Sequence, residues 1–236
     1  MLTVLITGSN RGIGLEFTKQ FLQKGWKCIA TCRNKDNSAN LKHLSEEFSQ
    51  NIIIEEMDIL NHSSIDQLAK KYTNQPIDII INNAGILGPR SSDVSSQEFG
   101  DMDYDFWDKV NKTNTIGPFK VVEAFFKSLE ISSKKIIVVI SSTVGSNIEM
   151  HAPIFSYASS KAGVNKVFTL LSKVLSNKGY KVHIFCPGNV KTAMGGANAN
   201  IAAYDSVNGM ISQILDPSFN QSGVFTRFSG EKIEFW

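Results

Sequence analysis

A tyrosine and a lysine lie four residues apart in the segment Tyr-Ala-Ser-Ser-Lys, at Tyr157 and Lys161. On a helix this spacing puts both side chains on one face, so that a phenol and an ammonium group can reach one site. The phenol can act as a general acid or base, and a nearby positive charge is expected to lower its pKa from about 10. With five tyrosines in 236 residues, such a pair arises by chance nearly as often as not. The value of this pair as evidence for a site therefore depends on its position in the chain.

Two serines, Ser141 and Ser142, end an apolar run shortly before this tyrosine. A hydroxyl group at a strand end can donate a hydrogen bond to an oxygen that gains negative charge, as a carbonyl oxygen does when the carbon accepts a hydride. Serines at strand ends are also common as caps of the next turn. Capping is the alternative role for Ser141.

Three glycines follow the first apolar run, in the segment Thr-Gly-Ser-Asn-Arg-Gly-Ile-Gly that begins at Thr7. Glycines permit a sharp turn from a strand into a helix, and they let a pyrophosphate approach the N–H groups of the helix N-terminus. A tight turn without a ligand is the alternative, but the position between a strand and a helix favours a dinucleotide. We expect these residues at the cofactor: Gly8, Asn10, Arg11, Gly12, Ile13 and Gly14.

The residue after the second apolar run decides which nicotinamide cofactor is favoured. An acidic side chain there would bind the adenosine ribose diol and repel a 2′-phosphate. This chain has Arg33 at that place, and Arg11 lies in the glycine-rich turn. Both can pair with a phosphate, whereas Asp36 lies further on, near the start of the next helix. The sequence therefore favours NADP(H), with NAD(H) as the alternative.

Short apolar runs alternate with longer amphipathic segments along the whole chain. Strands covered on both faces have such uninterrupted apolar runs, and alternation with helices predicts a doubly wound, Rossmann-type parallel sheet of about seven strands with helices on both faces. The expected strands span 2–7, 27–31, 52–57, 77–81, 135–140, 181–185 and 223–226. The expected helices span 12–24, 37–49, 62–73, 101–129, 154–177 and 200–214. We expect one domain over residues 1–236.

The composition is that of an ordinary soluble α/β protein, with 42% hydrophobic and 19% charged residues. A formal net charge of +2 does not indicate a nucleic-acid or membrane surface. The apolar N-terminal run is too short to cross a membrane and lacks the basic leader of a signal peptide. The three cysteines have no metal-binding spacing, so we expect no metal site and a reducing, cytoplasmic location.

The order of these motifs resembles the short-chain dehydrogenase/reductase family over essentially the whole chain. The glycine spacing Gly-x3-Gly-x-Gly is followed by Asn-Asn-Ala-Gly at 82–85, by an Asn three residues before a Gly at 114–117, by the two serines and by Tyr-x3-Lys. The segment Pro-Gly-Asn-Val-Lys-Thr at 187–192 resembles the family's Pro-Gly-x-Val-x-Thr. Residues 192–196 and 230–236 are most similar to sniffer-type and C-factor-like carbonyl reductases.

The resemblance implies a role for each matching residue. The catalytic set would be Asn114, Ser142, Tyr157 and Lys161, where Lys161 also holds the ribose hydroxyls and Asn114 holds a water. Asn111 competes with Asn114, but the spacing to Gly117 selects Asn114. Further cofactor contacts would be Asp58 and Ile59 at the adenine, Asn83, Ala84 and Gly85 at the ribose, and Pro187, Gly188, Val190 and Thr192 at the nicotinamide.

The sequence says less about substrate and partners. Pocket candidates are Leu87, Trp107, Ile148, His151, Phe155 and Met194, which suggest an apolar carbonyl compound, although packing in the core explains each apolar one equally well. Residues 195–200 are expected to form either a lid or an ordinary loop. Family members often pair through their long helices, which predicts a homodimer over 101–129 and 154–177, with a monomer as the alternative. Rival functions are a C-factor-like nucleotide-binding signalling protein and an NAD-dependent alcohol dehydrogenase.

Overall fold

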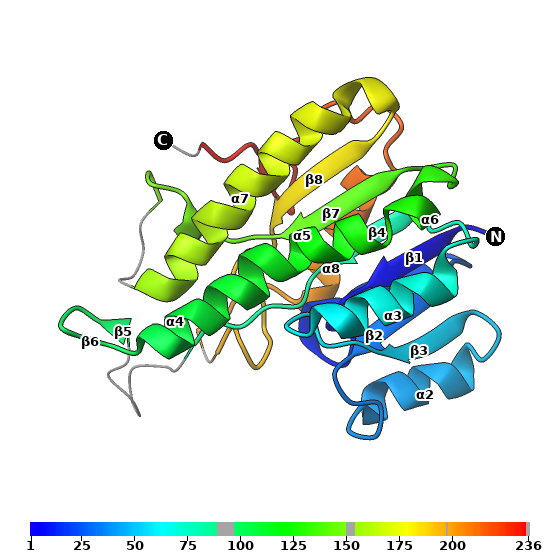
Figure 1. Cartoon of the computed structure of the whole chain (residues 1–236), viewed down its shortest axis with the longest axis horizontal. Helices are drawn as coiled ribbons and strands as arrows, with labels where there is room; N and C mark the ends of the chain where they lie inside the picture. The colour runs from blue at the N-terminus through cyan, green and yellow to red at the C-terminus, as the bar shows by residue number, and fades with distance from the viewer. Residues whose placement is uncertain (89–96, 150–153, 197, 235–236) are drawn as a thin grey trace.

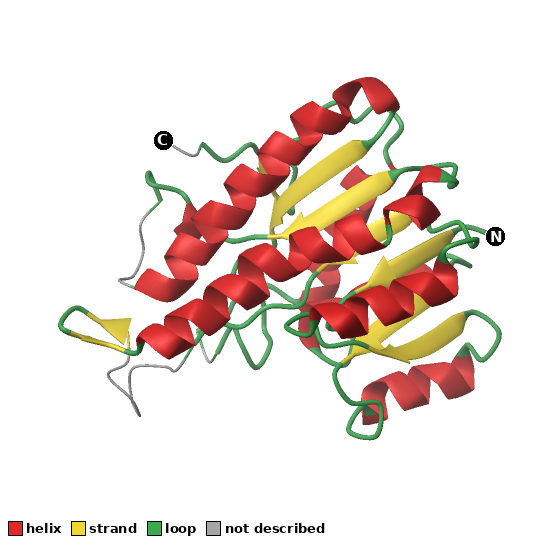
Figure 2. Ribbon diagram, viewed as in Figure 1, coloured by secondary structure: helices red, strands yellow, loops and turns green. Residues whose placement is uncertain are grey.

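The computed structural model describes residues 1–88, 97–149, 154–196 and 198–234 (Figure 1). His151 and the last two residues of the 230–236 ending lie outside the described residues. A central sheet lies between two layers of helices (Figure 2). No helix within the described ranges is long and apolar enough to cross a membrane.

The main sheet has seven strands, in the order β3-β2-β1-β4-β7-β8-β9, and all neighbouring strands are parallel. The doubly wound sheet expected from the sequence is therefore confirmed. Its strands are β1 (Thr3–Ile6), β2 (Lys27–Cys32), β3 (Ile52–Glu56), β4 (Ile79–Asn82), β7 (Ile136–Ile140), β8 (Lys181–Cys186) and β9 (Phe225–Arg227).

Helices cover both faces of this sheet, because successive strand side chains point to opposite sides. In β1, Leu5 packs under one layer, and Val4 and Ile6 pack under the other. The first layer holds α3 (His62–Tyr72), α5 (Gly117–Ala124), α6 (Phe126–Glu130) and α7 (Phe155–Leu175). The second layer holds α1 (Gly12–Gln23), α2 (Ala39–Glu47) and α8 (Ala203–Leu215).

The direction of winding reverses between β1 and β4. The chain runs from β1 outward to β2 and β3, and then returns to add β4 on the other side of β1. Ligands of such sheets bind in the crevice at the carboxyl ends of the strands, at this reversal. The glycine-rich turn and the Asn-Asn-Ala-Gly segment lie at these carboxyl ends, so the fold brings both to one place.

The prediction of one long helix over 101–129 is wrong, because the structure has several elements there. A hairpin of β5 (Gln97–Glu98) and β6 (Asp101–Met102) comes first, and its turn is possible because Gly100 has a φ of 97°. The helix then runs through α4 (Tyr104–Asn111), a π-helical turn η1 (Lys112–Ile116), α5 and α6.

The π-helical turn η1 has a local cause in the sequence. Pro118 has no N–H to donate to the carbonyl of Asn114, four residues earlier. The N–H of Gly117 instead reaches the carbonyl of Lys112, five residues back, as in a π-helix. Such turns occur frequently at functional sites, and this one contains Asn114.

Candidate active site

The glycine-rich turn after β1 is packed too tightly for any side chain at Gly14. A Cβ there would lie 2.3 Å from the carbonyl oxygen of Gly8 and 2.4 Å from Nδ2 of Asn83. Gly8 and Gly12 have φ values of 68° and 55°, which favour glycine. The sequence of the turn therefore follows from its geometry.

The turn after β1 is tied to the segment after β4 by side-chain hydrogen bonds. Nδ2 of Asn83 donates to the carbonyls of Thr7 and Gly8, at 2.9 and 3.1 Å. Oγ1 of Thr7 accepts the N–H groups of Asn83 and Ala84, both at 3.0 Å. Asn83 thus holds the segment after β4 against the turn after β1. Asn82 instead donates to the carbonyl of Val138 in the neighbouring strand.

The N-terminus of α1 is open to an anion. Arg11 occupies the N-cap position, and no side chain of the described residues caps this end of the helix. Its first-turn N–H groups and the positive end of the helix dipole can therefore bind a phosphate. Asn10 and Ile13 lie in the same turn, and the methyl group of Thr192 would be 3.3 Å from a Cβ on Gly12. The segment after β8 thus closes over the glycine-rich turn.

Two arginines border this helix end. Arg33 directly follows β2, and both Arg33 and Arg11 are exposed. Neither forms an ion pair with any residue in the part of the chain that the structure describes. Oδ1 of Asn34 accepts the N–H group of Asp36 at 2.8 Å, in a turn that ends before α2. Two cationic side chains are therefore free to meet a phosphate.

Asp58 and Ile59 follow β3. Oδ1 of Asp58 accepts the N–H group of Leu60 at 3.0 Å, which turns the chain toward α3. The side chain of Ile59 belongs to the core, and its carbonyl oxygen would be 3.1 Å from a Cβ on Gly117. The backbone after β3 thus lies against the start of α5.

The serine pair directly follows β7 as expected, but the residue that caps the next turn is Ser142 and not Ser141. Ser142 is the N-cap of the short turn η2 (Thr143–Gly145), where its Oγ accepts the N–H group of Val144 at 3.4 Å. Oγ of Ser141 is buried and donates to the carbonyl of Lys161. The side chain of Ser142 also forms a hydrogen bond with that of Tyr157.

The turn η2 packs directly against α7. A Cβ on Gly145 would lie 2.6 Å from the carbonyl carbon of Lys161 and 2.8 Å from the N atom of Ala162. Only a glycine permits this approach, which brings Ser142 to the first turns of α7. The sequence analysis did not single out Gly145, since one glycine in a loop carries no signal by itself.

Lys161 is almost completely buried, with 5% of its surface exposed. Its Nζ donates to the carbonyl of Ile140 at 2.8 Å and lies 5.5 Å from the centre of the Tyr157 ring. Burial disfavours the ammonium form and lowers the pKa of Lys161 to about 8. The lysine and the tyrosine therefore form one unit at the end of β7, as their spacing predicts.

The expected lowering of the Tyr157 pKa is wrong for this structure. Burial raises the pKa of Tyr157 well above its usual value, the Coulombic effect of Cys186 raises it further, and the hydrogen bond from Ser142 lowers it. The amine of Lys161 lies over the ring face and is hydrogen-bonded to a backbone carbonyl. Burial therefore outweighs any lowering, and the phenol is neutral at pH 7.

Asn114 connects three segments in the π-helical turn. Its Oδ1 accepts the N–H group of Ile86 at 2.9 Å, and its Nδ2 donates to the carbonyl of Ile86 and to Oγ of Ser160, at 2.8 and 3.0 Å. A Cβ on Gly85 would lie 3.2 Å from Oδ1 of Asn114 and 3.8 Å from Nζ of Lys161. The structure therefore brings Asn114 beside Lys161, with Ser160 as a link that the sequence analysis missed.

The segment after β8 makes a second tight turn at the carboxyl edge. Gly188 has a φ of 77°, and a Cβ there would lie 2.4 Å from Cδ1 of Ile201. The carbonyl of Pro187 accepts a hydrogen bond from Oγ of Ser206 at 2.7 Å, and Val190 is buried. Oγ1 of Thr192 accepts the N–H group of Gly195 at 3.1 Å. These contacts hold residues 187–192 beside the glycine-rich turn.

The substrate-pocket candidates are not all brought together. Trp107 and Phe155 line one pocket of about 490 Å³, with Phe99, Gly100, Met102 and Tyr104, whereas Ile148 and Met194 do not. Nε1 of Trp107 donates to Oγ of Ser159. Phe155 and Ser159 each lie two residues from Tyr157 on α7, so their side chains point to nearly the opposite side of the helix. This pocket therefore does not adjoin the phenol.

Comparisons with known proteins agree with this geometry. The family model described as short chain dehydrogenase matches residues 2–201. The C-signal protein of Myxococcus xanthus is 31% identical over 161 residues, which are 67% of this chain and 92% of that protein. The crystal structure of NADPH-bound carbonyl reductase from chicken fatty liver has a TM-score of 0.89 and 28% identity, and the match covers 99% of this chain and 98% of that one.

A second solved structure is equally similar in fold. The carbonyl reductase Sniffer of D. melanogaster has a TM-score of 0.89 and 27% identity, and the match covers 100% of both chains. The sheet order, the glycine-rich turn and the unit of Ser142, Tyr157 and Lys161 occur together in one chain that the family model matches over most of its length. The chain belongs to the short chain dehydrogenase family.

Proposed function

We propose that this chain is an NADP(H)-dependent carbonyl reductase, which moves a hydride between nicotinamide and the carbonyl or alcohol carbon of an apolar small molecule. The observation that carries the proposal is the unit of Ser142, Tyr157 and the buried Lys161 at the end of β7. There Lys161 lies over the ring of Tyr157, and the side chain of Ser142 is hydrogen-bonded to the same tyrosine. This unit lies at the carboxyl edge of the sheet, as does a turn suited to a dinucleotide.

The chain's own residues fit an NADP(H) molecule. The turn after β1 excludes a Cβ at Gly14, the N-terminus of α1 is uncapped, and Arg11 and Arg33 have no acidic partner in the described part of the chain. When bound, the reduced nicotinamide would supply the hydride. We propose that these residues hold the cofactor: Gly8, Asn10, Arg11, Gly12, Ile13, Gly14, Arg33, Asp58, Ile59, Asn83, Ala84, Gly85, Tyr157, Lys161, Pro187, Gly188, Val190 and Thr192.

The proposed chemistry of this chain's residues is proton transfer and charge stabilisation. A carbonyl oxygen gains negative charge as its carbon accepts a hydride, and the hydroxyl of Ser142 would donate a hydrogen bond to it. The neutral phenol of Tyr157 would donate its proton to that oxygen as general acid. Lys161 would then favour the phenolate, because its ammonium group lies within 5.5 Å of the ring centre. Asn114 would hold the water through which the proton is replaced.

A second candidate function is favoured by one comparison. The C-signal protein is 31% identical to this chain, and its name describes a signal rather than an enzyme. In that case the fold would bind a nucleotide with little turnover. The pairing of Tyr157 with the buried Lys161 favours the enzyme, since a binding module does not need a buried ammonium beside a phenol.

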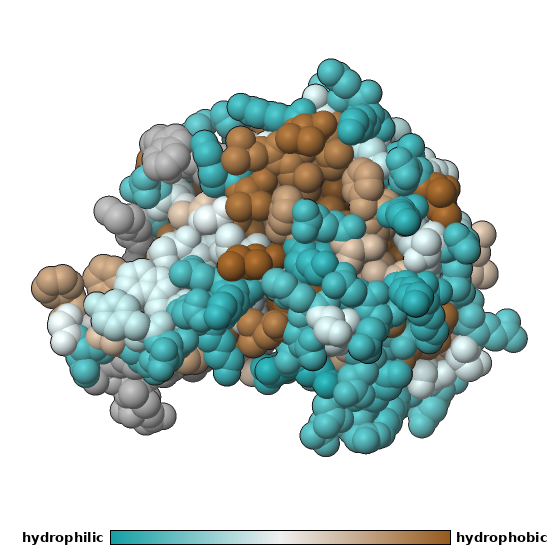
Figure 3. Space-filling model, in the orientation of Figure 1, coloured by the Kyte–Doolittle hydropathy of each residue, from teal (hydrophilic) through white to brown (hydrophobic). Residues whose placement is uncertain are grey.

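We also propose a homodimer that pairs through the helical layer of α5 and α7. Hydrophobic side chains gather on this face over the middle of α7 and toward α5 (Figure 3). Two hydrophobic side chains of α7, Leu170 and Val174, are 49% and 68% exposed, and Ile116, directly before α5, is 48% exposed. An apolar face of this kind on a folded chain favours burial against a second copy.

We further propose that the chain folds as one domain and works in the cytoplasm. Both cores lie on a single continuous sheet, which supports one folding unit. The three cysteines are free and buried, which supports a reducing compartment.

The experiment that tests the function is a panel of carbonyl compounds offered with NADPH. Quinones, aromatic aldehydes, diketones and aliphatic ketones would be compared, and NADPH consumption would be followed by its absorbance. We expect turnover of at least one apolar compound, faster with NADPH than with NADH. NADPH binding without consumption across the whole panel would contradict the reductase and support the signalling alternative.

A further inference from the structure

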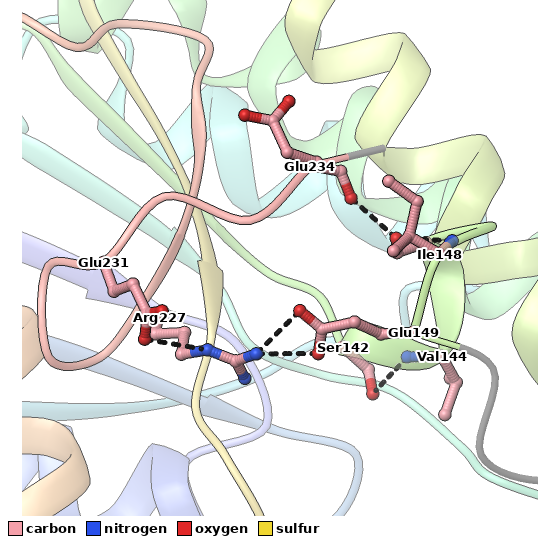
Figure 4. Close-up of polar contacts among 8 residues, drawn as sticks. Ser142, Val144, Ile148, Glu149, Arg227, Glu231 and Glu234 are labelled. Carbon is pink, nitrogen blue, oxygen red and sulfur yellow. Dashed lines mark hydrogen bonds and ion pairs between the residues drawn. The ribbon is translucent and has the colours of Figure 1, made fainter. Parts of the chain in front are cut away.

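The C-terminal hairpin reaches the loop that follows Ser142. Arg227 ends β9. The chain then turns back, so that residues 231–234 lie alongside β9. Figure 4 shows the guanidinium group of Arg227 between the carboxylates of Glu149 and Glu231. We call the contacts of Arg227 with Glu149 and of Glu234 with Ser146 the C-terminal clasp.

Arg227 carries the strongest contacts of the clasp. One terminal nitrogen of its guanidinium donates to both carboxylate oxygens of Glu149, each at 2.7 Å. Its Nε lies 3.3 Å from Oε2 of Glu231. The hydrogen bonds to Glu149 raise the pKa of Arg227 above its usual value. Such charge-assisted hydrogen bonds are short and are stronger than neutral ones.

A second contact closes the clasp further along the same loop. Oγ of Ser146 donates to the carbonyl of Glu234 at 2.6 Å and accepts the N–H group of Ile148 at 3.1 Å. The loop is therefore held by the C-terminal segment at two points, Ser146 and Glu149, and by Gly145 against α7.

The clasp also fixes the loop relative to the strand beside it. Cys186, at the end of β8, pairs with Arg227, and the N–H group of Phe228 donates to the carbonyl of Cys186 at 2.9 Å. The segment that begins at Pro187 follows directly. One hairpin thus connects the loop after β7 with the segment after β8, and both border the proposed reaction site.

The ion pair between Arg227 and Glu149 is partly shielded from water. The two side chains are 30% and 27% exposed, whereas the pair of Lys232 and Glu234 in the same hairpin is 58% and 64% exposed. Exposed pairs contribute little, and shielded, well-aligned ones contribute more. Loss of Arg227 should therefore have an effect that loss of Lys232 does not have.

We propose that Arg227 is a positioning residue, which through Glu149 holds the loop after Ser142 in the place where the carbonyl substrate binds. It contacts neither the phenol of Tyr157 nor the glycine-rich turn, so it should set substrate affinity rather than proton transfer or cofactor binding. The inference rests on the proposed carbonyl reduction, and it adds a role for the C-terminal hairpin.

Kinetics of three single variants test this role. In Arg227→Gln and in Glu149→Gln, KM for the best carbonyl substrate should rise roughly tenfold, the size expected from loss of a charge-assisted hydrogen bond. NADPH affinity and kcat should change little. In Lys232→Gln, a matched control with the same charge change in the same hairpin, KM should stay unchanged.

A comparison of KM in the single and double variants of Arg227 and Glu149 distinguishes loss of the clasp from general destabilisation of the fold. The double variant of Arg227→Gln and Glu149→Gln should raise KM by less than the sum of the two single effects, because both changes remove the same ion pair. The charge-swapped pair Arg227→Glu with Glu149→Arg should restore part of the affinity. Fully additive effects in the double variant, or a fall in kcat without a change in KM, would overturn the inference.

Hydrogen exchange of the loop amides tests the clasp without turnover. We expect amides of residues 143–149 to exchange faster in Arg227→Gln than in the unaltered chain or in Lys232→Gln, with the rest of the sheet unchanged. Unchanged exchange there would overturn the clasp even in an active enzyme. Faster exchange in a chain that reduces no carbonyl compound would uphold the clasp while the proposed function fails.

Discussion

Both ring nitrogens of His183 are buried without a hydrogen-bond partner among the described residues. The imidazole lies between the rings of Phe185 and Phe219, with centroids 5.4 and 4.4 Å away. Burial, and to a smaller extent the charge of Lys181, lowers the pKa of His183 to about 3. The folded chain therefore holds a neutral histidine where the unfolded chain would take up a proton below a pH of about 6.5.

This residue should make the fold sensitive to acid. The stability that neutral His183 contributes is complete above a pH of about 6.5, and it is lost as the pH falls toward 3. We expect the free energy of unfolding to fall with pH in this window, and to fall less in His183→Leu. Urea unfolding at several pH values would measure this free energy. An equal pH dependence in His183→Leu, or a loss of pH dependence in the exposed control His43→Gln, would contradict the account.

Arg33 should set the preference between the two cofactors. In Arg33→Asp the ratio of kcat/KM for NADPH to that for NADH should fall by at least about tenfold, because an acidic side chain would repel a 2′-phosphate and bind a ribose diol. Lys24→Asp, at the other end of α1, makes the same charge change as a control. An equal ratio in both variants would show that Arg33 does not meet the phosphate.

At the scale of single residues, the sequence predicted where the side chains lie better than it predicted their pKa values. The spacing of Tyr157 and Lys161 on one helix face follows from helix geometry, and the structure places them together. The direction of the Tyr157 pKa could not be predicted, because it depends on how deeply the phenol is buried and on which acceptor holds the lysine amine. Neither property is local in the sequence.

Among the elements, the short turn η2 is the one whose packing sets the position of Ser142. Gly145→Ala would place a Cβ 2.6 Å from the carbonyl carbon of Lys161, so the turn would have to move away from α7. We expect carbonyl reduction to fall by at least about tenfold, since a small displacement of a reacting group has an effect of that order. NADPH affinity, measured by fluorescence, should change little.

The outcome that would contradict this placement is specific. Normal kcat in Gly145→Ala, with the fold intact by circular dichroism, would mean that the approach of η2 to α7 does not position Ser142. A fall in NADPH affinity equal to the fall in kcat would mean that the change acts on the whole site. The two measurements together separate these cases.

Strands and helices differ in how well their bounds could be predicted. The continuous Ile and Val runs of β4 and β7 are typical of strands buried on both faces, and their positions were predicted to within two residues. The expected helix over 101–129 was wrong, because a proline, a π-helical turn and a glycine hairpin interrupt an apolar pattern that continues through them. The spacing of the hydrophobic residues alone does not reveal these interruptions.

For the whole molecule, the proposed dimer rests on the apolar face of α5 and α7. Leu170→Glu would put a charge on the exposed side of α7, where Leu170 is 49% exposed. We expect the mass in solution, by light scattering, to change from that of a dimer to that of a monomer. Tyr204→Glu, on α8 in the other helical layer, should leave the dimer intact. A monomeric unaltered chain would contradict the proposal.

The fold of the whole chain could be predicted because each strand–helix alternation permits few arrangements. Parallel strands joined by helices give right-handed crossovers, and these fix the winding of the sheet to a small number of orders. The role of the C-terminal hairpin could not be predicted, since Arg227 and Glu149 are 78 residues apart and ordinary as residue types. Contacts between such distant surface charges require the folded chain.

The central claim, that Tyr157 donates the proton in carbonyl reduction, is tested most directly by Tyr157→Phe. This variant keeps the ring and removes only the hydroxyl, and Tyr104→Phe at an exposed tyrosine is the matched control. We predict that kcat for the best carbonyl substrate falls on the order of 10²-fold or more in Tyr157→Phe, as expected for loss of a general acid. NADPH should still bind with nearly unchanged affinity. Near-normal turnover in Tyr157→Phe would contradict the account.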